Sequence, residues 1–339
     1  MLSFEGDEIY FKEEPYLIGK TFGEALSAYE DSSVIGLLRG GRPLLNLPMD
    51  TRIAPGDQII VIAEDNEATT LSGLTELKID ESAIQAGRTR PAAPERTLML
   101  GWNRHALSVI KELDNYVAPG SQTMVVANSA DGKSQLARCR ALLKNQSVSF
   151  TPGDTTNRPT LDELAIPTFH HIIVLSRSDA LGTQEADAEV LVTLLHLRDI
   201  RERSGQAFSV VSEMLDVRNR NLAEVTHADD FIVSDQLVSL VLSQVSQNRH
   251  LTAVFAELFD PEGCEIYLKP AEDYVSLGQP LNFYTVVEAA RRRGEIAIGY
   301  RLSGQARDAA QSYGVVLNPE KSKQVTLADG DKIIVVADR

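Results

Sequence analysis

The sequence predicts an α/β protein with a Rossmann-like, doubly wound parallel sheet, preceded by one small α+β lobe and followed by another. Two observations lead to this prediction. Short apolar runs alternate with amphipathic helical stretches between residues 96 and 233, which is typical of a parallel sheet covered by helices on both faces. The segments on either side of this region share five motifs in the same order, which indicates an internal duplication.

The doubly wound region opens with a strand, a tight turn and a helix. Residues 97–101 form an apolar run. The next apolar residues recur at helical spacing: Ala106, Leu107, Ile110, Leu113 and Val117. Residues 118–120, Ala-Pro-Gly, end this helix, and residues 123–127 predict a second strand. Because a crossover of this length permits parallel pairing, we interpret the segment as a β-α-β unit.

The alternation of strands and helices continues along the chain. Further strands are expected at residues 147–150, 170–176, 208–212 and 230–233, and further helices near residues 133–143, 183–203 and 218–225. Two amphipathic helices follow, at residues 235–247 and 251–259. Their apolar faces suit packing either within the chain or against a partner, and the pattern does not choose between the two.

The first lobe matches the end of the chain motif by motif. The matched segments are residues 5–12 with 262–269, 18–19 with 277–278, 35–36 with 298–299, 45–46 with 317–318, and 53–63 with 327–337. The alternative is convergence on a common turn-and-strand pattern, which would have to occur five times in one order. The second copy follows a doubly wound region, whereas the first copy starts almost at residue 1. We therefore expect the chain to be a piece of a longer protein.

This organisation predicts four segments along the chain. They are a first lobe at residues 1–66, a linker at 67–95, a Rossmann-like lobe at 96–248, and a helical crossover with the closing lobe at 249–339. The linker prediction rests on residues 86–94, which are polar and interrupted by glycine and proline. We expect this linker to be mobile and to separate two folding units.

The composition narrows the class of partner. The 339 residues carry a formal net charge of -15. Nucleic acids and anionic membranes both favour an excess of Lys and Arg, so neither is an expected partner. The two cysteines, Cys139 and Cys264, are too few for a disulfide framework, which fits a reducing compartment. No apolar run approaches the roughly 20 residues of a transmembrane helix, and we expect this stretch to be soluble.

The turn after the first strand of the doubly wound region is compared with the dinucleotide fingerprint G-x-G-x-x-G. Its three glycine positions hold Gly101, Asn103 and Ala106, and the acidic residue expected after the second strand is Asn128. We interpret Gly101, Asn103 and Asn128 as a degenerate nucleotide turn. The prediction is a Rossmann-shaped domain without a standard dinucleotide site.

Acidic residues follow two strands whose ends are expected at the carboxyl edge of the sheet, where ligands bind. The candidate Ca²⁺ ligands are Asp179, Glu185, Glu213 and Asp216, with Asp187 and Glu189 close to them in the sequence. The alternative is a helix cap at Asp179 and a solvated acidic helix face. We find no His, Ser or Cys arrangement that builds a catalytic centre, so no catalytic residue is predicted.

Seven motifs carry a family resemblance. They are GWNR at 101–104, VAPGS at 117–121, LRDI at 197–200, SEMLD at 212–216, SDQLVS at 234–239, ELFDPEG at 257–263 and KPAE at 269–272. In this order they resemble the CASTOR/POLLUX family of ion channels. The resemblance covers nearly the whole chain.

The resemblance implies the following organisation. Such channels carry a transmembrane pore followed by two RCK (regulator of K⁺ conductance) modules, each a Rossmann-like lobe with a small C-terminal lobe, and four subunits form a cytosolic gating ring. Residues 5–64 then resemble the end of the first module and residues 96–339 the whole second module, with the pore upstream in the same polypeptide. Plant relatives are cation channels of the nuclear envelope with Ca²⁺-responsive rings.

The function expected from this resemblance is regulatory and not enzymatic. The segment would couple ligand binding, with Ca²⁺ as the candidate, to opening of a cation pore, and it would pair with further copies of itself on the cytosolic face of a membrane. Two alternatives stay open. One is a peripheral nucleotide-binding subunit of a K⁺ uptake system, and the other is an NAD-dependent oxidoreductase with its nicotinamide site at Gly101.

Overall fold

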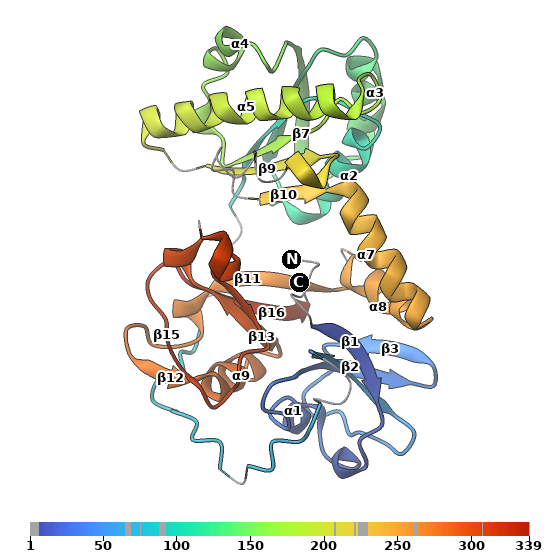
Figure 1. Cartoon of the computed structure of the whole chain (residues 1–339), viewed down its shortest axis with the longest axis vertical. Coiled ribbons are helices and arrows are strands. Elements are labelled where there is room, and N and C mark those ends of the chain that lie inside the picture. Colours follow the sequence, from blue (N-terminus) through green and yellow to red (C-terminus); the bar gives the residue numbers. More distant parts are fainter. Residues whose placement is uncertain are drawn as a thin grey trace. The chain divides into compact units, whose positions relative to one another are not determined.

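The computed structural model describes residues 7–64, 69–74, 76–87, 93–206, 208–219, 222, 230–260, 263–306 and 308–338. The chain forms two compact units. Unit 1 combines Met1–Thr89 with Ser243–Arg339, and unit 2 is Arg90–Leu242. The two ends of the sequence, blue and red in Figure 1, therefore belong to the same unit.

Unit 2 is built on a six-stranded parallel sheet. Its strands are β5 (Arg96–Leu100), β6 (Ser121–Ala127), β7 (Gln146–Pro152), β8 (His171–Val174), β9 (Ser209–Met214) and β10 (Asp230–Val233). The order across the sheet is β10-β9-β8-β5-β6-β7, and all neighbours are parallel. The order runs outward in both directions from the β5–β8 pair. This is the doubly wound sheet that the sequence predicts, so that prediction is confirmed.

Helices cover both faces of this sheet. They are α2 (Ala106–Tyr116), α3 (Gly132–Cys139), α4 (Arg158–Asp162) and α5 (Thr183–Ser204), with 3-10 turns η2 (Arg140–Leu142), η3 (Ile166–Thr168) and η4 (Val217–Asn219). Side chains alternate along β5, so Leu98 packs in one core with Val190 of α5. Met99 packs in the other core with Ile110 of α2 and Leu136 of α3. The helix expected near residues 218–225 lies mostly outside the described residues.

Unit 1 contains two small lobes, each with a four-stranded antiparallel sheet. The first lobe, residues 7–64, has β1 (Glu8–Lys12), η1 (Pro15–Leu17), α1 (Phe22–Ala25), β2 (Ser33–Arg39), β3 (Arg42–Leu45) and β4 (Gln58–Ala63). Its sheet order is β1-β4-β2-β3. β1, β2 and β4 coincide with short apolar runs of the sequence, whereas β3 contains no such run.

The second lobe, residues 263–338, repeats this plan. Its elements are β11 (Cys264–Pro270), η5 (Ala271–Asp273), β12 (Pro280–Asn282), α9 (Phe283–Arg291), β13 (Ile296–Arg301), η6 (Ser303–Gln305), η7 (Ala309–Gly314), β14 (Val315–Leu317), β15 (Gln324–Thr326) and β16 (Lys332–Asp338). The order β11-β16-β13-β14 is the order of the first lobe, strand for strand. Two helices precede this lobe, α7 (Ser234–Gln247), which contains the boundary between the units, and α8 (Leu251–Leu258).

Shared irregularities confirm the internal duplication. The pairing register shifts between Val34 and Gly36 in the first lobe, and between Ala297 and Gly299 in the second. At each shift the neighbouring strand passes so close that a Cβ would lie 2.3 Å from a carbonyl oxygen at Gly36 and 2.2 Å from one at Gly299. Both places therefore require glycine. The two lobes share an order of strands and a bulge at the same place. A common origin explains both features better than coincidence does.

The segment expected to be a free linker is bound to the second lobe over its described residues 76–87. The Gln85 N–H donates to the carbonyl of Tyr274, at 2.8 Å, and the Ser276 N–H donates to the carbonyl of Ala83, at 2.8 Å. The side chain of Ala83 is fully buried. This strap (residues 76–87) is therefore part of unit 1, which differs from the expectation of a mobile spacer. Many of its bonds are made by backbone groups, so the sequence has no periodicity from which the contact could be predicted.

Within the part of the chain that the structure describes, none of the helices combines the length and the apolar character that crossing a membrane requires.

Candidate functional site

The candidate site lies where the winding of the unit 2 sheet reverses. β5 and β8 are neighbours there, and their chain continuations leave the sheet toward opposite faces. Open α/β sheets bind ligands at this switch point, outside the carboxyl ends of the strands. Of the predicted site residues, Gly101 and Asn103 follow β5, and Glu213 lies near the end of β9. The structure brings these three residues together.

Gly101 is needed by the backbone. Its φ is +98°, and a Cβ at this position would lie 2.2 Å from the carbonyl oxygen of Leu175, just after β8. A side chain here would force the two neighbouring strand ends apart. The glycine is therefore explained by close approach between two segments of the protein, whether or not a ligand binds.

Asn103 occupies the place of the second fingerprint glycine and is 3% exposed. Its Nδ2 donates to the carbonyl of Ser176, at 2.8 Å, and to Oε2 of Glu213, at 2.7 Å. Its Oδ1 accepts from the N–H of His105, at 2.9 Å. A glycine at this position lets a pyrophosphate approach the backbone. Here the amide side chain of Asn103 fills that space, and its hydrogen bonds are made to groups of the protein itself.

Asp179 places a carboxylate on the amino end of α2. Its Oδ2 accepts from the backbone N–H of Arg104, at 2.6 Å. Helix amino ends attract anions because their first N–H groups have no partner within the helix and the helix dipole is positive there. In dinucleotide-binding folds a phosphate takes this position. In this chain the carboxylate of Asp179 lies next to this position, on the N–H of Arg104, two residues before α2 begins. Asp179 does not cap the helix that follows it, because the N-cap residue of α5 is Gly182 and no side chain caps that end.

Glu213 links three strand ends. Its Oε2 accepts from Asn103 and also from the N–H of Ser176, at 3.2 Å, and its Oε1 lies 3.4 Å from Nδ1 of His105. The side chain is 10% exposed. Sequence reasoning did not identify His105 or Ser176 as members of the site. A signal was available in Asn103, because a polar residue at a fingerprint glycine must find partners when it is buried.

The other acidic residues serve different purposes. Asp187, on α5, is fully buried and accepts from the N–H groups of Leu215 and Asp216, at 2.9 and 3.0 Å. Asp216 forms an ion pair with Arg218 at 2.6 Å, and the hydrogen bond from this guanidinium lowers the pKa of Asp216 to about 2. Glu185 is exposed in the first turn of α5. Asp187 thus holds the loop after β9. This role cannot be recognised from the sequence, where Asp187 is one of several neighbouring acidic residues.

These carboxylates do not assemble into a Ca²⁺ site in this structure. Among the described residues, no group of three or more His, Cys, Asp or Glu side chains is placed to hold a metal ion. Ca²⁺ takes six to eight oxygen ligands at short range. Asp179 and Asp216 are bound to donors of the protein, and Glu213 is bound to Asn103. The arrangement observed therefore does not fit the calcium prediction.

Asn128, the third residue of the predicted nucleotide turn, is exposed just after the end of β6. It presents an amide where a dinucleotide site has the carboxylate that binds the ribose hydroxyls. Asn103 and Asn128 thus both depart from the chemistry of the fingerprint, whereas Gly101 keeps its glycine.

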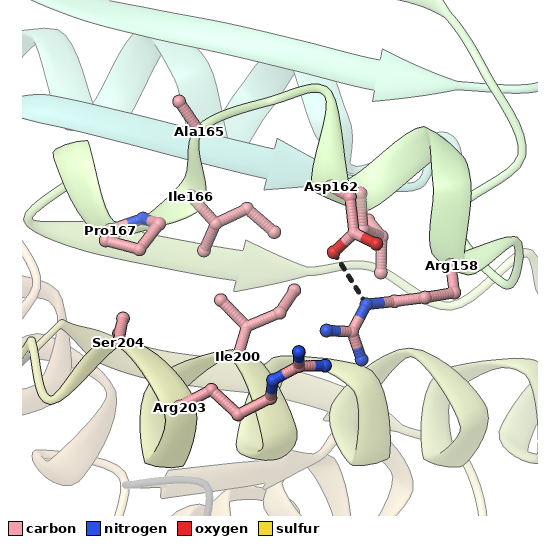
Figure 2. A pocket seen from close by; sticks show the side chains of 9 residues that line it. Arg158, Asp162, Ala165, Ile166, Pro167, Ile200, Arg203 and Ser204 are labelled. Atoms are coloured by element: carbon pink, nitrogen blue, oxygen red, sulfur yellow. Dashed lines mark hydrogen bonds and ion pairs between the residues drawn. The ribbon is translucent and has the colours of Figure 1, made fainter.

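A shallow pocket of about 390 Å³ lies elsewhere on unit 2, between α4, η3 and the last turn of α5 (Figure 2). Arg158 lines it and forms ion pairs with Asp162, at 2.7 Å, and Asp199, at 2.6 Å. The end of α5 precedes β9, so the pocket is at the amino edge of the sheet, opposite the switch point. The guanidinium of Arg158 is already paired with two carboxylates, and sheets of this kind bind ligands at the opposite edge. We therefore assign this pocket no function.

Comparisons with known proteins agree on one group of relatives. The family model described as Castor and Pollux, part of voltage-gated ion channel, matches residues 1–79. A probable ion channel POLLUX of Arabidopsis thaliana is 29% identical over 99% of this chain and 44% of its own length. A probable ion channel SYM8 of Pisum sativum is 30% identical over 99% of this chain and 41% of its own length.

The fold has a relative among solved structures. The human SLO3 gating ring aligns with a TM-score of 0.70 over 100% of this chain and 68% of its own, at 14% sequence identity. At this identity the likeness concerns the fold alone. The chain spans less than half the length of the curated relatives named above. Along almost all of its sequence, the chain is thus similar to proteins named as CASTOR and POLLUX ion channels.

Proposed function

We propose that this chain is a regulatory segment of a tetrameric cation channel of the CASTOR and POLLUX type, and that it forms part of a gating ring on the cytosolic face of the membrane. One observation carries the proposal most directly. Similarity to proteins named as ion channels extends over 99% of the chain, and the same residues align along their whole length with a solved gating ring.

The switch point supports a regulatory role in place of an enzymatic one. An NAD-dependent oxidoreductase needs a bound pyrophosphate at the turn after β5, where this chain has the buried amide of Asn103 and the carboxylate of Asp179. The bonds there join the ends of β5, β8 and β9 to one another. Such a cross-linked edge makes the lobe stiff, and a stiff lobe can transmit a displacement.

The mechanism proposed is a shift between two ring geometries. A ligand that binds one geometry more tightly than the other shifts the population toward it, by no more than the difference between its two binding free energies. The pore, in the same polypeptide, follows the geometry of the ring. The partners in this proposal are further copies of the chain and the pore, and a net charge of -15 disfavours nucleic acid.

The experiment that tests the proposal is reconstitution of the full-length protein in liposomes. The proposal predicts a cation flux and an assembly of four subunits, measured by a fluorescent cation indicator and by mass photometry. A protein that passes no cations, or one that turns over NADH with a saturable substrate, contradicts it.

A further inference from the structure

The two lobes of unit 1 contact each other through equivalent surfaces. β2 of the first lobe lies against β13 of the second, and these are the same strand of the duplicated fold. When two copies of one fold pair through one surface, each contact has a counterpart in which the copies exchange roles. Such pairing is self-complementary. The residues of a duplicated chain must therefore favour the pairing of a first lobe with a second lobe over the pairing of two first lobes or two second lobes.

One half of this interface is built around Glu30 of the first lobe. Its Oε2 accepts from the hydroxyl of Tyr284, at 2.7 Å, and its Oε1 accepts from the N–H of Ser322, at 2.7 Å. Its backbone carbonyl accepts from the N–H of Lys321, at 2.9 Å. Three donors of the second lobe thus meet one residue of the first.

Lys321 of the second lobe is buried in the same place and is 1% exposed. Its Nζ donates to the carbonyls of Tyr29, at 2.9 Å, and Ser32, at 2.6 Å, both in the first lobe. The charges that act on it are those of Glu30 and Asp31. A buried ammonium is costly unless acceptors and opposite charge surround it, and the first lobe supplies both.

The counterpart of this contact has different residues. The Tyr284 N–H donates to the carbonyl of Lys321, at 3.1 Å, and in the first lobe the Gly23 N–H donates to the carbonyl of Met49, at 2.9 Å. Gly23 and Met49 therefore stand where the second lobe has Tyr284 and Lys321. The residue that lies against Gly23 is Arg291, whose Cδ would be 3.3 Å from a Cβ at Gly23.

Arg291 is the counterpart of Glu30. Glu30 is nine residues after Thr21, the residue that caps α1, and Arg291 is nine residues after Asn282, which caps α9. The duplicated position is thus acidic in the first lobe and basic in the second. The position that faces it is apolar in the first lobe, as Met49, and basic in the second, as Lys321.

We propose that positions 30 and 291, together with positions 49 and 321, form a charge code that pairs a first lobe with a second lobe and excludes pairs of like lobes. In a pair of second lobes, the buried Lys321 of one copy meets Arg291 of the other, so it faces a guanidinium bound to Glu288 in place of the carboxylate of Glu30. In a pair of first lobes, Glu30 meets Gly23 and Met49, so it loses the hydroxyl donor of Tyr284 and the nearby positive charge of Lys321. Specificity of this kind needs unfavourable wrong pairs as well as a favourable right one.

The inference does not depend on the proposed channel function, because it concerns only which lobe pairs with which. It matters in any assembly of several copies, where every lobe is near both kinds of partner. Like charges that are brought together away from water repel strongly, whereas the observed pair attracts.

The test introduces, in the full chain, the residue types of positions 321 and 30 at their counterpart positions 49 and 291. Met49→Lys places an ammonium against Arg291, and the double variant Met49→Lys/Arg291→Glu places a carboxylate near the new ammonium, as Glu30 lies near Lys321. We expect Met49→Lys to lower the urea midpoint of unit 1 and to speed hydrogen exchange in β2 and β13, and the double variant to restore both. Met49→Leu, which adds no charge, is the control and should match the native protein. If the single variant Met49→Lys is as stable as the double variant Met49→Lys/Arg291→Glu, the proposal is overturned.

A second measurement reads pairing directly. Chains labelled with ¹⁴N and ¹⁵N are mixed, treated with a carboxylate–amine cross-linker and analysed by mass spectrometry. We expect cross-links between first and second lobes in the native protein, and cross-links between like lobes of different chains to rise in Glu30→Gln/Lys321→Met. Like-lobe cross-links that are as frequent in the native protein as in this variant overturn the proposal.

Discussion

The ammonium of Lys321 donates to the backbone carbonyl of Ser32 at 2.6 Å, so a buried charge of the second lobe ends on the chain of the first. Burial lowers the pKa of Lys321 to about 8, and the charges of Glu30 and Asp31 oppose this shift. The interface between the lobes therefore contains a group that titrates just above neutral pH.

The pH dependence of stability follows from this group. Unfolding returns Lys321 to water, where its pKa is 10.5, so between about pH 8 and 10.5 the unfolded chain binds more protons than the folded chain. The free energy of unfolding contributed by Lys321 thus rises with pH across this window, by roughly 3 kcal/mol in total. We expect Lys321→Met to remove the rise. Urea unfolding of both proteins at several pH values measures it.

The matched control for that experiment is Lys323→Met, because Lys323 is exposed two residues further along. The comparison cancels other groups, such as Cys264, whose pKa burial raises to about 12 and whose effect has the opposite sign. A Lys321→Met protein that keeps the native slope between pH 8 and 10 would contradict the assignment.

Breaking the cross-links at the switch point should destabilise unit 2. Asn103→Gly restores the fingerprint glycine but removes the donors to Ser176 and Glu213, and it leaves a nearly buried carboxylate short of a partner. We expect a loss of about 1–3 kcal/mol, measured by urea unfolding with Trp102 fluorescence. Asn128→Gly, at an exposed position, is the control. A variant as stable as the native protein would show that the amide of Asn103 has no structural role.

Two acidic residues of α5 should behave differently although they are two positions apart. Asp187→Asn keeps an acceptor for only one of the N–H groups of Leu215 and Asp216 and turns an NH₂ group toward the other, and we expect a loss of about 1–3 kcal/mol with faster hydrogen exchange at residues 215–219. Glu185→Gln, at an exposed position, should change stability by less than about 0.5 kcal/mol. Similar effects of the two substitutions would contradict the buried role of Asp187.

The duplicated glycines offer a paired test of the shared origin. Gly36→Ala and Gly299→Ala each place a methyl group within 2.3 Å of a carbonyl oxygen of the neighbouring strand. We expect each to cost at least about 1–3 kcal/mol, because strands in a packed sheet have little room to move. Gly304→Ala, where a Cβ has no neighbour within 4 Å, should be nearly neutral. Thermal unfolding measures all three, and a neutral result at one of the paired positions alone would argue against equivalent bulges.

Much of the fold could be predicted from the sequence because its signals are local. The alternation of apolar strands with amphipathic helices indicates a parallel sheet, and the paired motifs around Gly36 and Gly299 indicate a duplication. The short strand β3 escaped because Arg42–Leu45 has neither alternation nor length. The strap at residues 76–87 was not predicted because many of its contacts are made by backbone groups, which every residue carries.

The candidate site could be predicted in place but not in detail. The rule that ligands bind at the carboxyl ends of parallel strands was enough to bring Gly101, Asn103 and Glu213 together. It could not show that Asp179 binds the N–H of Arg104, because this depends on the path of the loop after β8. Lys321 was missed entirely, since a lysine in a loop reads as solvated and only the packing of the two lobes buries it.

The central claim is that this chain regulates a cation pore, and single-channel recording from the full-length protein tests it most directly. We predict that Asn103→Ala, which unlinks the ends of β5, β8 and β9, changes the open probability and leaves the single-channel conductance unchanged, while the exposed Asn128→Ala changes neither. An open probability that is indifferent to Asn103→Ala, or the absence of any cation current, would contradict the account.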